Sequence, residues 1–249
     1  MKITIISTFS PKHYKEYGKY FLGSLTKYIH HEIDVVLYTD IPMEFSKANF
    51  SNRILNDSCP DLVEFKNRNQ HREVPDGTKG WLKDAVRFSH KSYCIVHASQ
   101  TIDTDLLIWL DADTEILSHI TPQYLSEQIT APSFVSYLGR AGRYSETGWL
   151  CFDMRNQHAS DFFNKWKWYY DTDTIYNLPA QLDCHVFDAV RTEFRKNGKT
   201  IYQSISIDEN GASHFDKRFI GKMCHYKGDQ KADRDSNFIR ANVRAKKKK

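Results

Sequence analysis

The sequence predicts an α/β fold with an open, mostly parallel central sheet flanked by helices. Two β-rich segments, residues 2–8 and 34–40, enclose a segment at 14–30 whose apolar side chains recur every four positions, as on one face of a helix. A second helix-then-strand pair follows at 80–99 and 103–113. Strands that alternate with helices favour parallel pairing, because parallel neighbours need a long crossover connection.

The remaining elements follow in chain order. Residues 43–75 are mixed and polar, with weak helix signals. Two closely spaced strands, at 133–138 and 147–154, suggest antiparallel additions to the sheet. Helices are expected at 158–172 and at 181–198, the latter ending at a glycine in the C-cap region. No linker divides the chain, so we expect one domain over residues 1–235 and a basic, disordered tail over 236–249.

Composition narrows the class of protein. The 249 residues include five scattered cysteines without a CxxC pair, which argues against a disulfide framework or zinc ribbon and favours a reducing, cytoplasmic setting. The apolar runs are too short for a transmembrane segment, and no signal peptide is recognisable.

Charge is concentrated at the C-terminus. The net charge is +4, and the last twelve residues supply six cations and no acid, so the rest of the chain is at −2. A uniformly basic nucleic-acid-binding surface is therefore not indicated, and we expect no nucleic-acid partner. The alternative to a solvated tail is weak contact with an anionic membrane surface. The six cations are Arg240, Arg244, Lys246, Lys247, Lys248 and Lys249.

Two acids, Asp111 and Asp113, end the strand "LLIWLDAD". Ligands bind at the carboxyl ends of strands in open α/β sheets, and paired carboxylates suit Mg²⁺ or Mn²⁺. In the alternative, structural interpretation, Asp113 caps the next helix and Asp111 merely ends the strand. A phosphatase of the DxDxT type would need this motif after its first strand and a Thr where Glu115 stands, and no phosphate-binding GxxxxGK loop is present.

"WLDADT" resembles the DxD motif of GT-A-fold glycosyltransferases, which hold a nucleotide-sugar diphosphate through a divalent metal. "HYKGDQK", residues 225–231, resembles the H-x-x-G-x-x-K motif of the glycogenin-like and lipopolysaccharide-galactosyltransferase group. The resemblance implies that His225 is a third metal ligand, that Gly228 lets the backbone approach the phosphates, and that Lys231 contacts the diphosphate. The proline that often follows this lysine is absent, since Ala232 stands there.

Three further segments resemble parts of the same family. "SETG" resembles an acceptor-side segment, in which Glu146 would bind sugar hydroxyls and Gly148 would admit a close ligand; the alternative is a hairpin turn. Asp183, in "QLDC", would be the general base of an inverting enzyme or would stabilise the reacting sugar in a retaining one; alternatively it is a helix N-cap.

The helix "WLKDAVRFSHKSY" supplies the third of these segments. It would contribute Arg87 to the phosphates and Asp84 to the donor sugar, while Lys91 fits an exposed charged face equally well. The combined pattern over residues 79–231 also resembles small phage, algal-virus and bacterial glycosyltransferases of single GT-A domains.

The first two strand ends are the expected nucleoside site. Thr8 and Asp40 would contact the ribose or base, and Tyr38 would stack on a uracil. The resemblance thus implies a metal-dependent glycosyltransferase that uses Mn²⁺ or Mg²⁺, a nucleotide-sugar donor with UDP preferred, and an acceptor hydroxyl. The alternatives are a metal-dependent nucleotidyltransferase or phosphatase, and a non-catalytic nucleotide-sugar-binding module.

Overall fold

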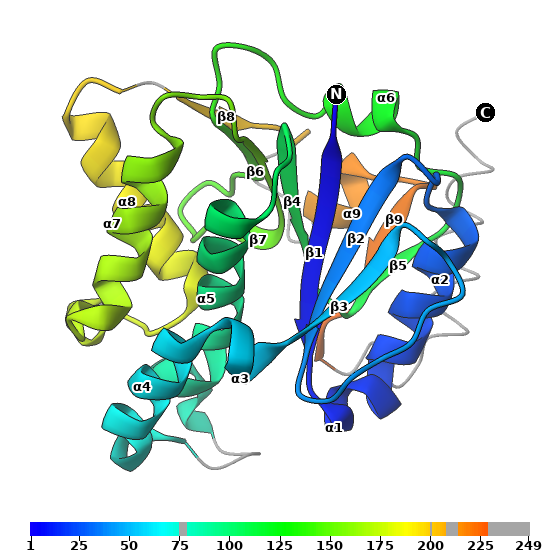
Figure 1. The fold of residues 1–249 in the computed structure, drawn as a ribbon. Coiled ribbons are helices and arrows are strands. Elements are labelled where there is room, and N and C mark those ends of the chain that lie inside the picture. Colours follow the sequence, from blue (N-terminus) through cyan, green and yellow to red (C-terminus); the bar gives the residue numbers. More distant parts are fainter. Residues whose placement is uncertain (75–78, 200, 208–213, 229–249) are drawn as a thin grey trace.

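The structure is a computed structural model that describes residues 1–74, 79–199, 201–207 and 214–228. Within these ranges a seven-stranded sheet lies between two layers of helices, and a two-stranded sheet packs beside it (Figure 1). The strands are β1 (Ile3–Phe9), β2 (Ile33–Thr39), β3 (Phe50–Ile54), β4 (Leu106–Leu110), β5 (Thr114–Ile116), β6 (Val135–Leu138), β7 (Glu146–Asp153), β8 (Tyr202–Ser204) and β9 (Met223–His225).

The large sheet has the strand order β3-β2-β1-β4-β7-β6-β8. Strands β3, β2, β1 and β4 are mutually parallel, whereas β7 runs antiparallel to both β4 and β6. The predicted parallel half with later antiparallel additions is therefore confirmed. The expected strands at 2–8, 34–40, 133–138 and 147–154 correspond to β1, β2, β6 and β7.

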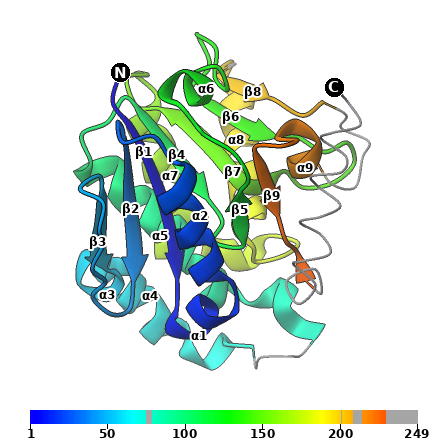
Figure 2. The ribbon, with the colours of Figure 1, turned by 90° about the vertical axis from the view of Figure 1, so that its right-hand side faces the viewer.

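The helices cover both faces of the sheet. One layer contains α4, α5, α7 and α8, and the other contains α2, α9 and the small sheet of β5 and β9, as Figure 1 and the turned view in Figure 2 show. The α-helices are α1 (Pro11–His13), α2 (Lys19–Tyr28), α3 (Leu55–Ser58), α4 (Pro60–Asn69), α5 (Ala85–Thr101), α6 (Pro122–Ser126), α7 (Ala159–Asp171), α8 (Asp183–Lys196) and α9 (His214–Arg218). A π-helical turn (Tyr14–Gly18) and three short 3-10 helices (Gln70–Arg72, Lys79–Lys83 and Thr174–Asn177) complete the set.

The sheet has a hydrophobic core on each of its two faces, and the side chains of each central strand alternate between them. In β4, Leu106, Ile108 and Leu110 belong to the core beneath α2, while Leu107 and Trp109 belong to the core beneath α5. Successive side chains of a strand point to opposite faces, and a central parallel strand is buried on both, so the sequence reads as an unbroken apolar run. Asp111 comes two residues after Trp109, so its side chain lies on the same side of the sheet, the side that α5 covers.

Four elements differ from the sequence expectations, namely α5, β3, β8 and β9. The helix predicted from residue 80 begins at Ala85, because the Asp84 side chain accepts a hydrogen bond from the Arg87 amide and caps α5. The polar region 43–75 contains the edge strand β3 as well as α3 and α4. Strands β8 and β9 have only three residues each, too few to show a periodic pattern.

No helix in the described part of the chain combines the length and apolar character needed to cross a membrane. The expected domain boundary at residue 235 and the basic tail lie outside the described residues.

Candidate active site

The parallel strands of the large sheet end at one cleft. Thr8 in β1, Asp40 directly after β2 and Asp111 directly after β4 all line this cleft, whose volume is about 900 Å³. Carboxyl ends of neighbouring parallel strands lie on a common edge, so residues far apart in sequence meet there. Helix α5 forms another wall, with Asp84, Arg87 and Lys91 among the lining residues.

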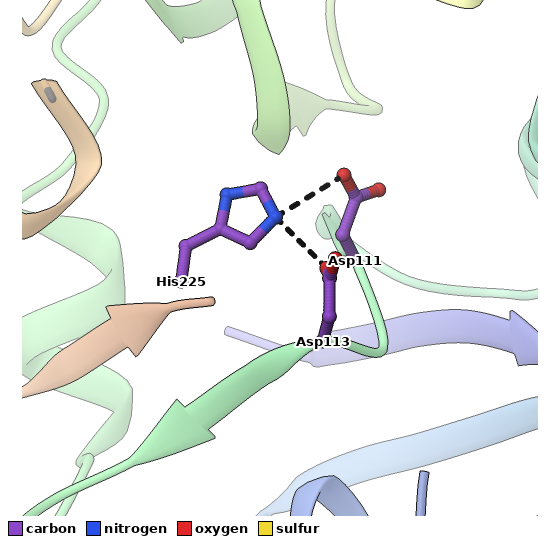
Figure 3. Close-up of side chains that lie close together, drawn as sticks. All are labelled: Asp111, Asp113 and His225. Atoms are coloured by element: carbon purple, nitrogen blue, oxygen red, sulfur yellow. Dashed lines mark hydrogen bonds and ion pairs between the residues drawn. The ribbon is translucent and has the colours of Figure 1, made fainter. Parts of the chain in front are cut away.

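Asp111, Asp113 and His225 form a compact cluster (Figure 3). The His225 Nε2 atom lies 2.8 Å from Asp113 Oδ1 and 3.7 Å from Asp111 Oδ2. One potential ligand atom from each residue lies within 4.8 Å of the others. The structure therefore brings together the three residues that the sequence predicts as metal ligands.

Pairing of β5 with β9 explains how this cluster forms. Thr114 lies opposite His225 in the antiparallel register, and the Tyr226 amide donates a hydrogen bond of 3.0 Å to the Asp113 carbonyl oxygen. The turn after β4 and the end of β9 are thereby held side by side. Since β5 follows Asp113 directly, the alternative in which Asp113 caps a helix is wrong.

The donor set suits a hard divalent cation. Burial of the His225 imidazole opposes its protonation, but the carboxylates of Asp113, Glu146 and Asp111 outweigh burial and raise its pKa. Such a concentration of acids around one buried ring would be relieved by a cation. Two carboxylates with one imidazole form a donor set that suits Mn²⁺ or Mg²⁺, so the residues present fit the expected metal.

Lys91 joins this cluster to the start of α8. Its Nζ lies 3.0 Å from Asp111 Oδ1 and 2.8 Å from Asp183 Oδ2, and it donates to the Thr147 carbonyl oxygen. Burial opposes the charge, but Asp111 and Asp183 more than offset it and raise the pKa of Lys91. The interpretation of Lys91 as part of an exposed charged face is wrong, because it is 8% exposed.

Asp183 is the first residue of α8, and it lines the cleft. Its Oδ2 accepts a hydrogen bond of 2.6 Å from the Thr147 hydroxyl as well as the contact from Lys91. Leu182 occupies the N-cap position and makes no side-chain cap bond, so Asp183 is not the N-cap that the alternative interpretation required.

Asp84 is the N-cap of α5 and Arg87 lies in its first turn, whereas the sequence prediction placed both inside a helix that begins at residue 80. Asp84 is buried as the helix cap, and its Oδ1 accepts the Arg87 amide at 3.0 Å. Both residues line the cleft.

Glu146 and Gly148 lie beside His225. Glu146 Oε1 is 3.7 Å from His225 Nδ1, its Oε2 contacts Lys227, and burial leaves it 7% exposed. Although burial favours the neutral acid, His225, Lys227 and Arg140 lower the pKa of Glu146 to about 2. The sugar-binding role of Glu146 and the ligand-admitting role of Gly148 stay predictions; in the structure both residues face the His225 imidazole.

The structure contradicts the expected stacking of Tyr38 on a uracil. Its ring is fully buried beneath α5, and its hydroxyl lies 2.9 Å from His97 Nδ1, so it cannot stack on a base in this conformation. Tyr38 precedes the last residue of β2 and its parity directs it into the core. Thr8 donates its hydroxyl hydrogen to the Tyr38 carbonyl oxygen at 2.8 Å, while exposed Asp40 lines the cleft.

Only residues 225–228 of the H-x-x-G-x-x-K motif belong to the part of the chain that the structure describes. Gly228 has a φ of +52°, in the left-handed region that favours glycine, three residues after His225. Lys231 lies outside the described residues.

Two residues of the site were missed by the sequence interpretation. Tyr17, from the π-helical turn, lines the cleft, and burial together with Asp113 and Asp111 raises its pKa. The Trp109 indole donates a hydrogen bond of 2.6 Å to Asp111 Oδ1. A signal for the latter existed, because Trp109 and Asp111 share one face of the strand at a spacing of two.

Neither a protein-family model nor a curated protein matches the chain. Solved structures do. Mouse xyloside xylosyltransferase 1 superposes with a TM-score of 0.54 at 11% identity, covering 83% of this chain and 86% of that one. The bifunctional glycosyltransferase WbbM gives a TM-score of 0.54 at 12% identity and covers 91% of this chain; this chain spans 46% of it. At such identities the likeness establishes the GT-A fold and nothing finer.

Proposed function

We propose that the protein is a metal-dependent glycosyltransferase that moves a sugar from a nucleotide-diphosphate sugar to an acceptor hydroxyl. The observation that carries this proposal is the cluster of Asp111, Asp113 and His225 at the strand ends of a GT-A fold. Low-identity likeness alone would support only the fold, whereas the cluster adds a donor set suited to a metal and a diphosphate.

We assign different residues to the nucleoside, the diphosphate and the sugar of the donor. Thr8 and Asp40, at the ends of β1 and β2, bind the nucleoside, for which the family resemblance favours UDP. Arg87 on α5 and Lys231, the last residue of the H-x-x-G-x-x-K motif, contribute cations to the diphosphate. A bound Mn²⁺ or Mg²⁺, held by Asp111, Asp113 and His225, supplies stabilisation of the negative charge that develops on the departing diphosphate.

Asp183 acts at the sugar. The acceptor oxygen forms a bond to the anomeric carbon while the bond from that carbon to the diphosphate oxygen breaks. In an inverting reaction Asp183 takes the acceptor proton; in a retaining reaction it stabilises the positive charge of the sugar, and the departing diphosphate oxygen takes the proton. Its contacts with Thr147 and Lys91 fix its orientation in either case. Analysis of the anomeric linkage of the product distinguishes the two.

One assay separates this proposal from its rivals. The protein is incubated with a panel of nucleotide sugars and Mn²⁺, and release of nucleoside diphosphate is followed for wild type and Asp111→Ala. Release by the wild type alone is expected. Activity on nucleoside triphosphates or phosphomonoesters without a sugar acceptor would favour a nucleotidyltransferase or phosphatase, and donor binding without release would favour a binding module.

A further inference from the structure

Three consecutive residues at the start of β7 contact the metal cluster and the pair of Lys91 and Asp183. Glu146 contacts the His225 ring and Lys227, the Thr147 hydroxyl and carbonyl groups bind Asp183 and Lys91, and the Gly148 carbonyl oxygen accepts the Asp111 amide at 3.0 Å. The antiparallel pairing of β7 with β4 brings this segment next to the turn that carries Asp111.

Gly148 occupies a special place in this segment. A Cβ atom on Gly148 would lie 2.6 Å from Cε1 and 2.8 Å from Nδ1 of His225. Real Cβ atoms do not approach other heavy atoms so closely, so the space that a side chain would fill is occupied by the imidazole. Gly148 has no positive φ, so steric contact is what disfavours a side chain here: the two His225 atoms are the nearest, and Glu146 Oε1 follows at 3.1 Å.

The imidazole has little room to move away. Its side chain is 4% exposed, and its ring centroid lies 5.2 Å from that of Phe215 in α9. Glu146 Oε1, which accepts the Gly148 amide at 3.1 Å, stands near Nδ1. A methyl group at position 148 would therefore shift or rotate the ring and change the direction of Nε2, the atom that faces Asp111 and Asp113 (Figure 3).

We propose that Gly148 is a positioning residue of the metal centre: the absence of its side chain sets the orientation in which His225 binds the cation. The inference rests on the proposed metal-dependent function, but it concerns an interaction within the protein that exists with or without metal. Groups that orient a metal-binding histidine commonly change metal affinity by about 10–100-fold when they are altered.

The test is a double-mutant cycle between Gly148→Ala and His225→Ala, with Gly23→Ala as a matched control. Gly23 lies in α2, and a Cβ there would meet nothing within 4 Å. Two quantities are measured for each purified variant: the dissociation constant for Mn²⁺, by electron paramagnetic resonance of the free ion, and the melting temperature without metal.

We expect Gly148→Ala to weaken Mn²⁺ binding by about 10–100-fold and to lower the melting temperature, while Gly23→Ala changes neither adversely. In the His225→Ala background both effects of Gly148→Ala should shrink, because the colliding ring is gone. Unchanged Mn²⁺ binding by Gly148→Ala, or equal effects in both backgrounds, would overturn the inference.

Failure of the proposed function has a different signature. If the wild type binds no Mn²⁺, the metal centre itself is refuted, and the assignment of Gly148 as a metal-positioning residue falls with it. The melting temperatures would still reveal the steric coupling between residues 148 and 225. The two failures are thus distinguishable within one set of variants.

Discussion

At the scale of single residues, Lys91 stands out because its charged side chain is buried within the site. It is a buried cation between two acids from different elements, Asp111 after β4 and Asp183 at the start of α8. Burying a charge is costly unless partners compensate, and here the two carboxylates compensate the Lys91 ammonium, which in turn offsets their mutual repulsion. Removal of the ammonium would leave two carboxylates facing each other in a largely enclosed site.

Replacing Lys91 with Met should therefore lower the free energy of unfolding by about 3–5 kcal/mol and abolish donor turnover. Chemical denaturation measures the first effect, and diphosphate release the second. Lys2→Met is the matched control, since the pair of Lys2 with Asp103 is highly exposed and should contribute less than about 1 kcal/mol. Equal losses in the two variants would contradict the role assigned to Lys91.

His90 gives the stability a dependence on pH. Burial, with repulsion from Lys66 and His13, lowers the pKa of His90 from 6.5 to about 4. The unfolded chain therefore takes up this proton at a higher pH than the folded protein does, so stability present above pH 6.5 is lost as the pH falls toward 4. Because the ring is only partly buried by accessible surface, we expect a loss of about 1–2 kcal/mol.

Denaturation curves near pH 7 and pH 5 for wild type and His90→Gln measure this effect. The variant should lose less stability between the two conditions, whereas His31→Gln, at an exposed position, should behave as the wild type. An identical pH dependence for wild type and His90→Gln would exclude His90 as its source.

The sequence predicted some residues of the site and missed others for physical reasons. Asp111, Asp113 and His225 belong to short motifs whose chemistry is visible in the residue types. Lys91 was undervalued because spacing along a helix does not show which neighbour will bury it. Tyr38 was misplaced because its distance from the strand end, and not its parity, was used.

At the scale of elements, the small sheet of β5 and β9 is the part that assembles the metal ligands. Its two strands have three residues each and pair only with each other, whereas the longer strand β1 pairs with a neighbour on both sides in the large sheet. Short strands at the edge of a fold open more easily than central ones. A ligand that bridges the turn before β5 and the end of β9 should therefore stabilise this sheet selectively.

Hydrogen exchange with and without Mn²⁺ tests this expectation. The Tyr226 amide, which bonds to the Asp113 carbonyl oxygen, should gain up to about 2.7 kcal/mol of protection at a hundredfold excess over the dissociation constant. Amides of β1 that exchange only by global unfolding serve as the reference. No added protection at Tyr226 beyond that of β1 would count against a metal held between β5 and β9.

Element types were easier to predict than element ends. The long apolar runs of β1, β2 and β4 and the periodic helices were visible in the sequence, because burial on two faces or one leaves a pattern. The start of α5 depended on one side-chain cap, and β9 on pairing with a partner that comes over a hundred residues earlier in the chain. Neither leaves a periodic signal.

At the scale of the whole molecule, the strand order creates the cleft. The parallel block β3-β2-β1-β4 places the carboxyl ends of four strands on one edge, and antiparallel β7 begins at the same edge. Alternation of strands and helices was enough to predict this class of fold. The convergence of β4, β7, α5, α8 and β9 on one point required the three-dimensional structure.

The central claim is that a metal held by Asp111, Asp113 and His225 binds the diphosphate of the donor. Titration calorimetry of UDP into the protein, with Mn²⁺ and with a chelator, tests it most directly. The account predicts binding that requires Mn²⁺ and that is lost in Asp113→Ala, because the carboxylates alone would repel the diphosphate. Equally tight binding of UDP in the presence of the chelator would contradict it.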